Sequence, residues 1–186
     1  MTLSTVVLDR DGVINRDSEA FIKSPAEWHA IPGSLEAIAR LRHAGLRVMV
    51  ATNQSGLGRG LFEYDALLAM HEKMTRQLAD LGVALDGVFF CPHTAEAGCM
   101  CRKPATGMLD DIMSRWHLAA TECVMVGDSP TDIQAAHAAG MAALGVRTGK
   151  PIDTDDQRWA SVAMFDDLTG AVEHILAERV RHSTEG

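Results

Sequence analysis

Three cysteines and a histidine lie within one short stretch of this chain, residues 91 to 101. A catalytic zinc would need an open fourth position, and this set has no ligand to spare. A disulfide would leave an odd thiol, and a pairing between residues two apart would be strained. The spacing C-x-H-x₅-C-x-C therefore predicts a closed, structural zinc site, with plain buried thiols as the alternative. Its ligands would be Cys91, His93, Cys99 and Cys101.

Acidic residues follow two apolar runs that are far apart in the sequence. Asp9 and Asp11 end the first run, and Asp128 ends the second. Carboxylates brought together repel one another unless a cation joins them, and hard oxygen ligands suit Mg²⁺. Asp9 is then free to act as a nucleophile through one oxygen, while Asp11 donates and later accepts a proton. The alternative is an ordinary Asp-Gly turn.

Groups that suit a phosphoryl anion follow two other apolar runs. Thr52 and Asn53, with Ser55 and Gly56 beyond them, offer a hydroxyl and backbone N–H groups to an oxyanion. A polar loop is the alternative for this stretch. Lys103 supplies the positive charge that both a phosphoryl group and crowded carboxylates require.

Asp132 has two possible roles. It closes the sequence Ser129-Pro130-Thr131-Asp132, an S-x-x-D capping box with proline at the first helical position. It is therefore either a helix cap alone or a residue that also lies near the metal or Lys103.

Short apolar runs that alternate with helical stretches would position these groups. The runs are β-branched or aromatic and continuously apolar, as is typical of strands buried on both faces of a parallel sheet. The pattern predicts an α/β fold with a doubly wound, Rossmann-like parallel sheet, in which ligands lie at the carboxyl ends of the strands. The acids, Thr52 and Lys103 should then share one rim. The expected strands are residues 5–9, 47–52, 87–91, 123–128, 142–146 and 161–165.

Helix signals lie between these strands. Apolar residues recur at helical intervals from 63 to 81, and Gly82 has the position that follows a helix. Ser34 is expected to cap a helix that ends at Gly45. A last helix is expected over 167–179, after a polar connector at 150–158, and the last few residues are expected to fray.

Length, composition and charge limit the kinds of protein possible. A chain of 186 residues, 47% of them hydrophobic, favours a single domain over 1–186 with a zinc-binding loop at 91–103. The formal net charge of -8 argues against broad nucleic-acid or anionic-membrane binding. No basic leader or membrane-length apolar run is present, and the cysteines suit a reducing compartment. We therefore expect a cytoplasmic monomer with no nucleic-acid or membrane partner.

Together, Asp9-x-Asp11, Thr52, Lys103 and Asp128 resemble, in order, the four motifs of the haloacid dehalogenase-like (HAD) phosphohydrolase superfamily. The resemblance spans nearly the whole chain. It implies that Asp9 becomes an aspartyl phosphate, that Asp11 is the general acid/base, and that Thr52 and Lys103 hold the phosphoryl group. It also implies Mg²⁺ bound by Asp9, Asp128 and the carbonyl of Asp11. Segments that carry cap domains in this superfamily are short here, so we expect no large cap domain.

The zinc cluster followed by RKP, with DRDGVIN and TNQSG, is similar to one branch of this superfamily, which contains phosphatases of heptose bisphosphate and of histidinol phosphate. The similarity implies a phosphorylated sugar as substrate, with removal of the 7-phosphate of D-glycero-D-manno-heptose 1,7-bisphosphate in lipopolysaccharide core biosynthesis. Histidinol phosphate is the alternative, and a non-enzymatic phospho-receiver module is a distant one. The residues implied for the sugar and its second phosphate are Asn53, Arg59, Arg102 and Lys150.

Outside the zinc cluster, seven histidines share no spacing with the predicted rim. We interpret them as surface or core polar residues, and Cys123, inside an expected strand, as a small core residue. The seven are His29, His43, His71, His117, His137, His174 and His182.

Overall fold

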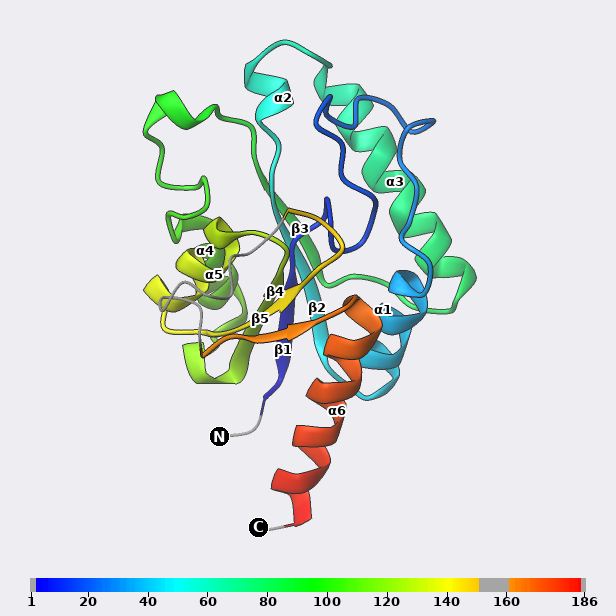
Figure 1. The fold of residues 1–186 in the computed structure, drawn as a ribbon, viewed down its shortest axis with the longest axis vertical. Coiled ribbons are helices and arrows are strands. Elements are labelled where there is room, and N and C mark those ends of the chain that lie inside the picture. The colour runs from blue at the N-terminus through cyan, green and yellow to red at the C-terminus, as the bar shows by residue number, and fades with distance from the viewer. Residues whose placement is uncertain (1–2, 151–160, 185–186) are drawn as a thin grey trace.

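A six-stranded parallel sheet forms the centre of the protein in the computed structural model, which describes residues 3–150 and 161–184 (Figure 1). The strand order is β3-β2-β1-β4-β5-β6, and every neighbouring pair is parallel. This order confirms the predicted doubly wound sheet. The strands are β1 (Thr5–Leu8), β2 (Arg47–Asn53), β3 (Gly87–Cys91), β4 (Cys123–Gly127), β5 (Ala142–Val146) and β6 (Ala163–Phe165).

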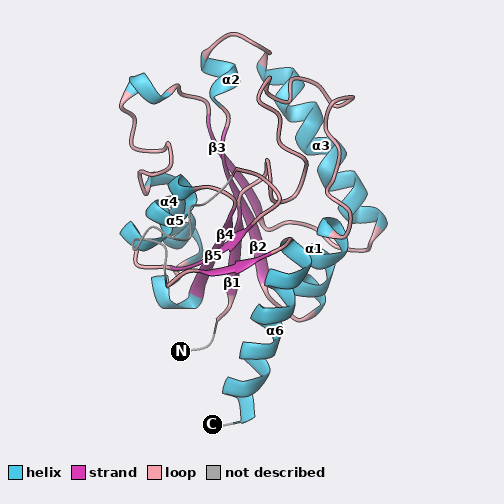
Figure 2. Ribbon diagram, viewed as in Figure 1, coloured by secondary structure: helices cyan, strands magenta, loops and turns pink. Residues whose placement is uncertain are grey.

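Helices cover both faces of the sheet (Figure 2). One face packs against α1, α3 and α6, and the other against α4 and α5. The described helices are α1 (Ser34–His43), α2 (Ser55–Gly58), α3 (Tyr64–Asp80), α4 (Gly107–Trp116), α5 (Pro130–Ala138) and α6 (Leu168–Thr184), with 3-10 turns η1 (Ala95–Ala97) and η2 (Ala120–Glu122).

The strands are mostly apolar because successive side chains enter different cores. In β1, Val6 and Leu8 pack with α1, α3 and α6, whereas Val7 lies in the core under α4 and α5. In β2, Val50 likewise packs with α1, α3 and α6, and Met49 lies in the core under α4 and α5. Alternation with a period of two therefore buries both faces, which is why the strands read as unbroken apolar runs.

Two of the predicted helix ends are confirmed, and one predicted start is wrong. Gly45 and Gly82 follow α1 and α3 with φ of 79° and 75°, in the left-handed region that favours glycine. Ser34 is not the N-cap of α1, because Gly33 has that position and Ser34 is the first helical residue. The Ser34 hydroxyl instead donates to the carbonyl of Ile14 at 2.6 Å. A contact with a distant segment has therefore replaced the local cap.

A long loop between β1 and α1, residues 9–33, has no helix or strand and lies beside α3 (Figure 1). Lys73 of α3 anchors it, since its Nζ donates to the carbonyls of Pro25 and Trp28 at 2.7 Å each. The same ammonium lies 5.7 Å from the centre of the Trp28 ring. These contacts fold the loop over the carboxyl end of the sheet.

The described residues contain no large cap domain, as the sequence predicted. None of their helices is long and apolar enough to cross a bilayer. The predicted connector at 150–158 lies, after residue 150, outside the described residues, and so does the expected fraying at 185–186.

Candidate active site

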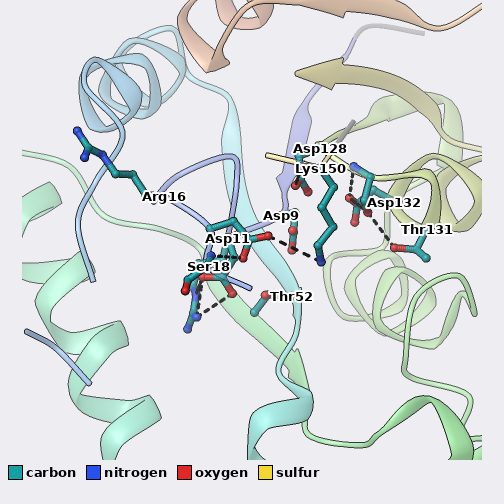
Figure 3. Close-up of polar contacts among 12 residues, drawn as sticks. Asp9, Asp11, Arg16, Ser18, Thr52, Asp128, Thr131, Asp132 and Lys150 are labelled. Atoms are coloured by element: carbon teal, nitrogen blue, oxygen red, sulfur yellow. Dashed lines mark hydrogen bonds and ion pairs between the residues drawn. The ribbon is translucent and has the colours of Figure 1, made fainter. Parts of the chain in front are cut away.

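The residues predicted at the strand ends converge on one cleft of about 410 Å³. The cleft lies at the carboxyl edge of the sheet, where β1, β2 and β4 end, so residues far apart in the chain become neighbours (Figure 3). Of the predicted residues, Arg59 alone among the sugar and phosphate candidates does not line it. The predicted residues that do are Asp9, Asp11, Thr52, Asn53, Arg102, Lys103, Asp128 and Lys150.

Lys103 is the buried cation of this cleft, with 2% of its surface exposed. Its Nζ donates to Asp9 Oδ1 at 2.9 Å and to the carbonyl of Ala51 at 2.6 Å, and lies 2.6 Å from Asp132 Oδ1. Burial alone would lower the pKa of Lys103, but the carboxylates of Asp132 and Asp9 raise it above its ordinary value. Lys103 therefore stays charged and holds one of the two Asp9 oxygens.

Three carboxylates form an acid cluster made of Asp9, Asp128 and Asp132, and Figure 3 shows them around a common space. One oxygen of each lies within 4.8 Å of the others. Burial raises the pKa of Asp9 to about 6 and that of Asp128 to about 8, and repulsion within the cluster adds to both shifts, although Lys103 opposes the rise at Asp9. Three buried carboxylates this close together offer the hard oxygen ligands that fit a divalent cation such as Mg²⁺.

Two glycines make room for Asp128. Gly12 has φ of 84°, and a Cβ at Gly12 or at Gly149 would collide with the Asp128 carboxylate. The backbone N–H of Lys150 donates to Asp128 Oδ2 at 2.8 Å. The two glycines and this amide therefore fix the carboxylate from three sides.

Asp11 lies in a different environment from the acid cluster. Its carboxylate accepts hydrogen bonds from Arg10 at 2.8 to 3.1 Å, from Asn15 Nδ2 at 2.8 Å and from Gln54 Nε2 at 2.7 Å. Burial would raise the pKa of Asp11, but the Arg10 charge and these hydrogen bonds hold it below its ordinary value. These donors fix the orientation of the Asp11 carboxylate, and the predicted Mg²⁺ contact of Asp11 is through its backbone carbonyl.

The sequence did not predict the partners of Asp11. Arg10 is fully buried, and its Nη1 lies 3.3 Å from Nε2 of His71 on α3. Gln54 also donates to the Thr52 hydroxyl at 3.0 Å. Arg10 and Gln54 were open to prediction, since each is a polar residue beside a predicted site residue at a strand end. His71 had no such signal, because only the packing of α3 brings it to Arg10.

Five residues of the long loop line the cleft and were also not predicted: Asp17, Ser18, Glu19, Phe21 and Ile22. Asp17 Oδ2 lies 3.8 Å from Lys150 Nζ across the cleft. Phe21 has φ of 63°, a left-handed conformation that is uncommon for a large side chain. The loop reaches the cleft through its contacts with α3, which leave no local pattern in the sequence.

Thr52 and Asn53 are both engaged with neighbouring residues. Thr52 is 1% exposed. The Asn53 amide donates to the carbonyl of Lys103 at 3.0 Å, and its oxygen accepts from the Lys103 N–H at 3.1 Å. Asn53 therefore clamps the backbone that carries Lys103, and its role toward a sugar stays a prediction.

Of the two predicted arginines, Arg102 lines the cleft and Arg59 lies outside its lining. Arg102 donates through Nη1 to the carbonyl of His93 at 3.2 Å. Arg59 follows α2 and is exposed. The pKa of Glu96 is lowered first by hydrogen bonds from its own backbone and from Thr94, and further by the charges of Arg59 and Arg102. The two cations therefore lie near the same part of the zinc-binding loop.

The predicted zinc ligands lie together. The Sγ–Sγ distances among Cys91, Cys99 and Cys101 are 3.1, 3.5 and 3.6 Å, and His93 Nδ1 lies 3.5 Å from Cys91 and 3.3 Å from Cys101. With Zn–S bonds of about 2.3 Å, the edges of a tetrahedral site would be roughly 3.7 Å, so the four residues fit zinc. All four cysteines of the chain are free thiols, and no disulfide competes.

Asp132 does both things that its sequence position allowed. Its Oδ2 accepts from the backbone N–H and the hydroxyl of Ser129 at 3.1 and 2.6 Å, which completes the predicted capping box at α5. Its Oδ1 pairs with Lys103. One carboxylate therefore fixes both the helix start and the buried cation.

A parallel sheet of this order, with an Asp-x-Asp pair after β1 and a buried lysine and further acids at the same rim, defines a hydrolase of the HAD type. Residues 100–171 match the HAD-hydrolase-like family. The D-glycero-beta-D-manno-heptose-1,7-bisphosphate 7-phosphatase of Bordetella bronchiseptica is 48% identical over 95% of this chain and 99% of that protein. The enzyme of that name from Neisseria meningitidis serogroup A is 43% identical over 95% and 96%.

A solved structure agrees with these relatives. It is the crystal structure of D,D-heptose 1,7-bisphosphate phosphatase from B. bronchiseptica complexed with magnesium and phosphate. It superposes with a TM-score of 0.87 at 46% identity and covers 95% of this chain and 99% of that chain. The chain belongs to this family of HAD-like phosphatases, and it is a phosphatase.

Proposed function

We propose that this phosphatase removes the 7-phosphate of D-glycero-β-D-manno-heptose 1,7-bisphosphate through an aspartyl-phosphate intermediate on Asp9. Two relatives, 48% and 43% identical over 95% of this chain, support the substrate and its β anomer, because their names contain both. The contact that supports the chemistry is the hydrogen bond from Lys103 to Asp9 Oδ1, which holds the Asp9 carboxylate next to Asp128.

In the first step, Asp9 attacks phosphorus in line with the departing sugar oxygen. A P–O bond forms to Asp9 as the P–O bond to the sugar breaks. Asp11 must enter this step protonated, and it gives that proton to the leaving oxygen, so the sugar departs as an alcohol. Lys103, with Thr52, holds the phosphoryl oxygens and offsets their charge.

In the second step, Asp11, now ionised, takes a proton from a water molecule that attacks the aspartyl phosphate. Inorganic phosphate leaves and Asp9 is restored. The hydrogen bonds from Arg10, Asn15 and Gln54 support this step, because they stabilise the ionised form of Asp11.

We propose that Mg²⁺ is held by Asp9, Asp128 and the carbonyl of Asp11. Six carboxylates and three cations line the cleft, so a phosphorylated substrate would meet a net negative site without a metal. When bound, Mg²⁺ supplies the positive charge that joins the carboxylates to the phosphoryl oxygens.

The experiment for the substrate compares phosphate release, with and without Mg²⁺, from both anomers of the heptose bisphosphate and from histidinol phosphate. We expect the highest kcat/KM for the β bisphosphate and no activity without Mg²⁺. Histidinol phosphate is the rival because Asp17 and Glu19 line the cleft and would suit a cationic substrate. A preference for it would overturn the proposed substrate while leaving Asp9 and Asp11 in their proposed roles.

The second phosphate is proposed to meet Arg102 and Lys150, with Arg59 farther out. Because Arg102 lines the cleft and Arg59 does not, Arg102→Ala should raise KM for the bisphosphate more than Arg59→Ala does. For a monophosphate, the two variants should behave alike. Equal effects on the bisphosphate would remove Arg102 from this role.

We propose that zinc binds Cys91, His93, Cys99 and Cys101 and fixes the loop that presents Arg102 and Lys103. Metal analysis should find about one zinc per chain after dialysis. Cys101→Ser should lose zinc and activity together, because the loop is then no longer held. Cys123→Ser, a buried thiol outside the cluster, should keep both. A zinc-free protein with full activity would contradict this proposal.

We also propose that the enzyme is a cytoplasmic monomer. A single chain supplies every residue of the proposed site, and free thiols suit a reducing compartment. Sedimentation at micromolar concentration should give the mass of one chain, and a stable dimer would contradict this.

A further inference from the structure

Arg10 is a fully buried cation that links the Asp11 carboxylate to His71 of α3. Its Nε and Nη2 donate to both oxygens of Asp11, and its Nη1 points to His71 Nε2 at 3.3 Å. Among the described residues, these are the side-chain partners of the Arg10 guanidinium. Arg10 therefore contacts Asp11, which the proposed mechanism uses, and His71, which it does not use.

The tautomer of His71 follows from the chemistry of arginine. A guanidinium has no acceptor and stays protonated, so Nε2 of His71 must accept the hydrogen bond and the ring proton must lie on Nδ1. Burial and the charge of Arg10 lower the pKa of His71 to about 4, which agrees with a neutral ring. The ring is held in place against Phe90 of β3, with centroids 6.1 Å apart.

We propose that His71 is a positioning residue that aims Arg10, and through it orients the Asp11 carboxylate for proton transfer. This inference rests on the proposed role of Asp11 as general acid. A planar guanidinium that grips both oxygens of a carboxylate fixes its plane, but only if the guanidinium is itself fixed. Without an acceptor at position 71, Nη1 of Arg10 is buried without a hydrogen bond, which is unfavourable. We expect the guanidinium to rotate in search of a partner and so to release Asp11.

The test separates proton donation from the rest of catalysis. His71→Leu removes the acceptor at similar size, and His71→Gln keeps an acceptor near the position of Nε2. Each is assayed by kcat/KM, which reports steps up to release of the leaving group, with the heptose bisphosphate and with p-nitrophenyl phosphate. The sugar oxygen needs a proton to leave, whereas nitrophenolate does not.

We expect His71→Leu to lower kcat/KM for the sugar phosphate about 10-fold and that for the aryl phosphate by less than about 3-fold. His71→Gln should recover most of the loss. His174→Leu is the matched control, because that ring is also half-buried on a helix and packs on a phenylalanine, Phe165, at 5.2 Å, outside the cleft. His174→Leu should leave kcat/KM unchanged for both substrates.

Equal losses for both substrates in His71→Leu, or no recovery in His71→Gln, would overturn the proposal, since a purely structural role predicts either. If the wild-type enzyme hydrolysed neither the heptose bisphosphate nor p-nitrophenyl phosphate, the proposed function itself would be wrong. The two failures are therefore distinguishable.

Discussion

Replacing Asp9 with asparagine is expected to abolish phosphate release while leaving the fold intact. An amide cannot form the acyl phosphate, so turnover should fall at least about 10⁴-fold. The amide is close in size to the carboxylate and still accepts from Lys103, and it removes one charge from the acid cluster, so the thermal midpoint should change little. Phosphate release and thermal melting measure the two parts of this result.

Asp166→Asn is the control for this substitution, because Asp166 is fully exposed and lies outside the cleft. It should retain normal activity. A folded Asp9→Asn protein that turns over at the normal rate would refute the covalent mechanism. An unfolded variant would show that Asp9 is needed for stability, and Asp9→Glu would then serve as the second variant, since it keeps the charge but moves the reacting oxygen.

Replacing Lys103 with methionine should have the second largest effect and should change both activity and stability. Methionine fills similar space but leaves Asp9 and Asp132 without their shared cation. We expect kcat/KM to fall at least about 10³-fold, because the phosphoryl group loses its buried charge partner. Breaking a buried ion pair from one side should also lower the free energy of unfolding by about 3 kcal/mol.

The stability part of this prediction is measured by denaturant unfolding without Mg²⁺. Lys23→Met, at a lysine outside the cleft, should leave stability and activity unchanged. Asp132→Asn in the Lys103→Met background should cost less than it does alone, because its partner is already gone. A Lys103→Met protein with wild-type activity, or additive losses in the double variant, would contradict the ion-pair account.

Much of the fold was open to prediction from the sequence because its signals are local. The expected strands β1 to β5 match the observed ones to within a residue, since each is a short run rich in β-branched, aromatic or small apolar side chains, and only β6 begins two residues later than expected. The last helix extends to Thr184, beyond the expected end at 179, because no glycine or proline marks its end. The prediction that Ser34 caps α1 was wrong because its hydroxyl donates to the carbonyl of Ile14, 20 positions away in the chain.

The chemistry of the candidate site was predictable where it depends on which residues follow a strand. Parallel strands bring their carboxyl ends to one edge, so Asp9, Thr52 and Asp128 had to meet once the sheet formed. The zinc ligands were predictable for a similar reason, because four ligands within eleven residues can close a tetrahedron without help from the rest of the fold.

The sequence by itself therefore determined the sheet, the shared rim and the zinc cluster, because periodicity and short spacing act over a few residues. Only the tertiary structure decided the direction of each side chain at the rim. It turned Asp11 toward Arg10 and Gln54, brought His71 of α3 behind Arg10, and gave the two oxygens of Asp132 different partners. Such contacts join residues far apart in the chain, 61 positions between Arg10 and His71 and 94 between Asp9 and Lys103, and depend on how helices pack on the sheet. No local pattern in the sequence encodes that packing.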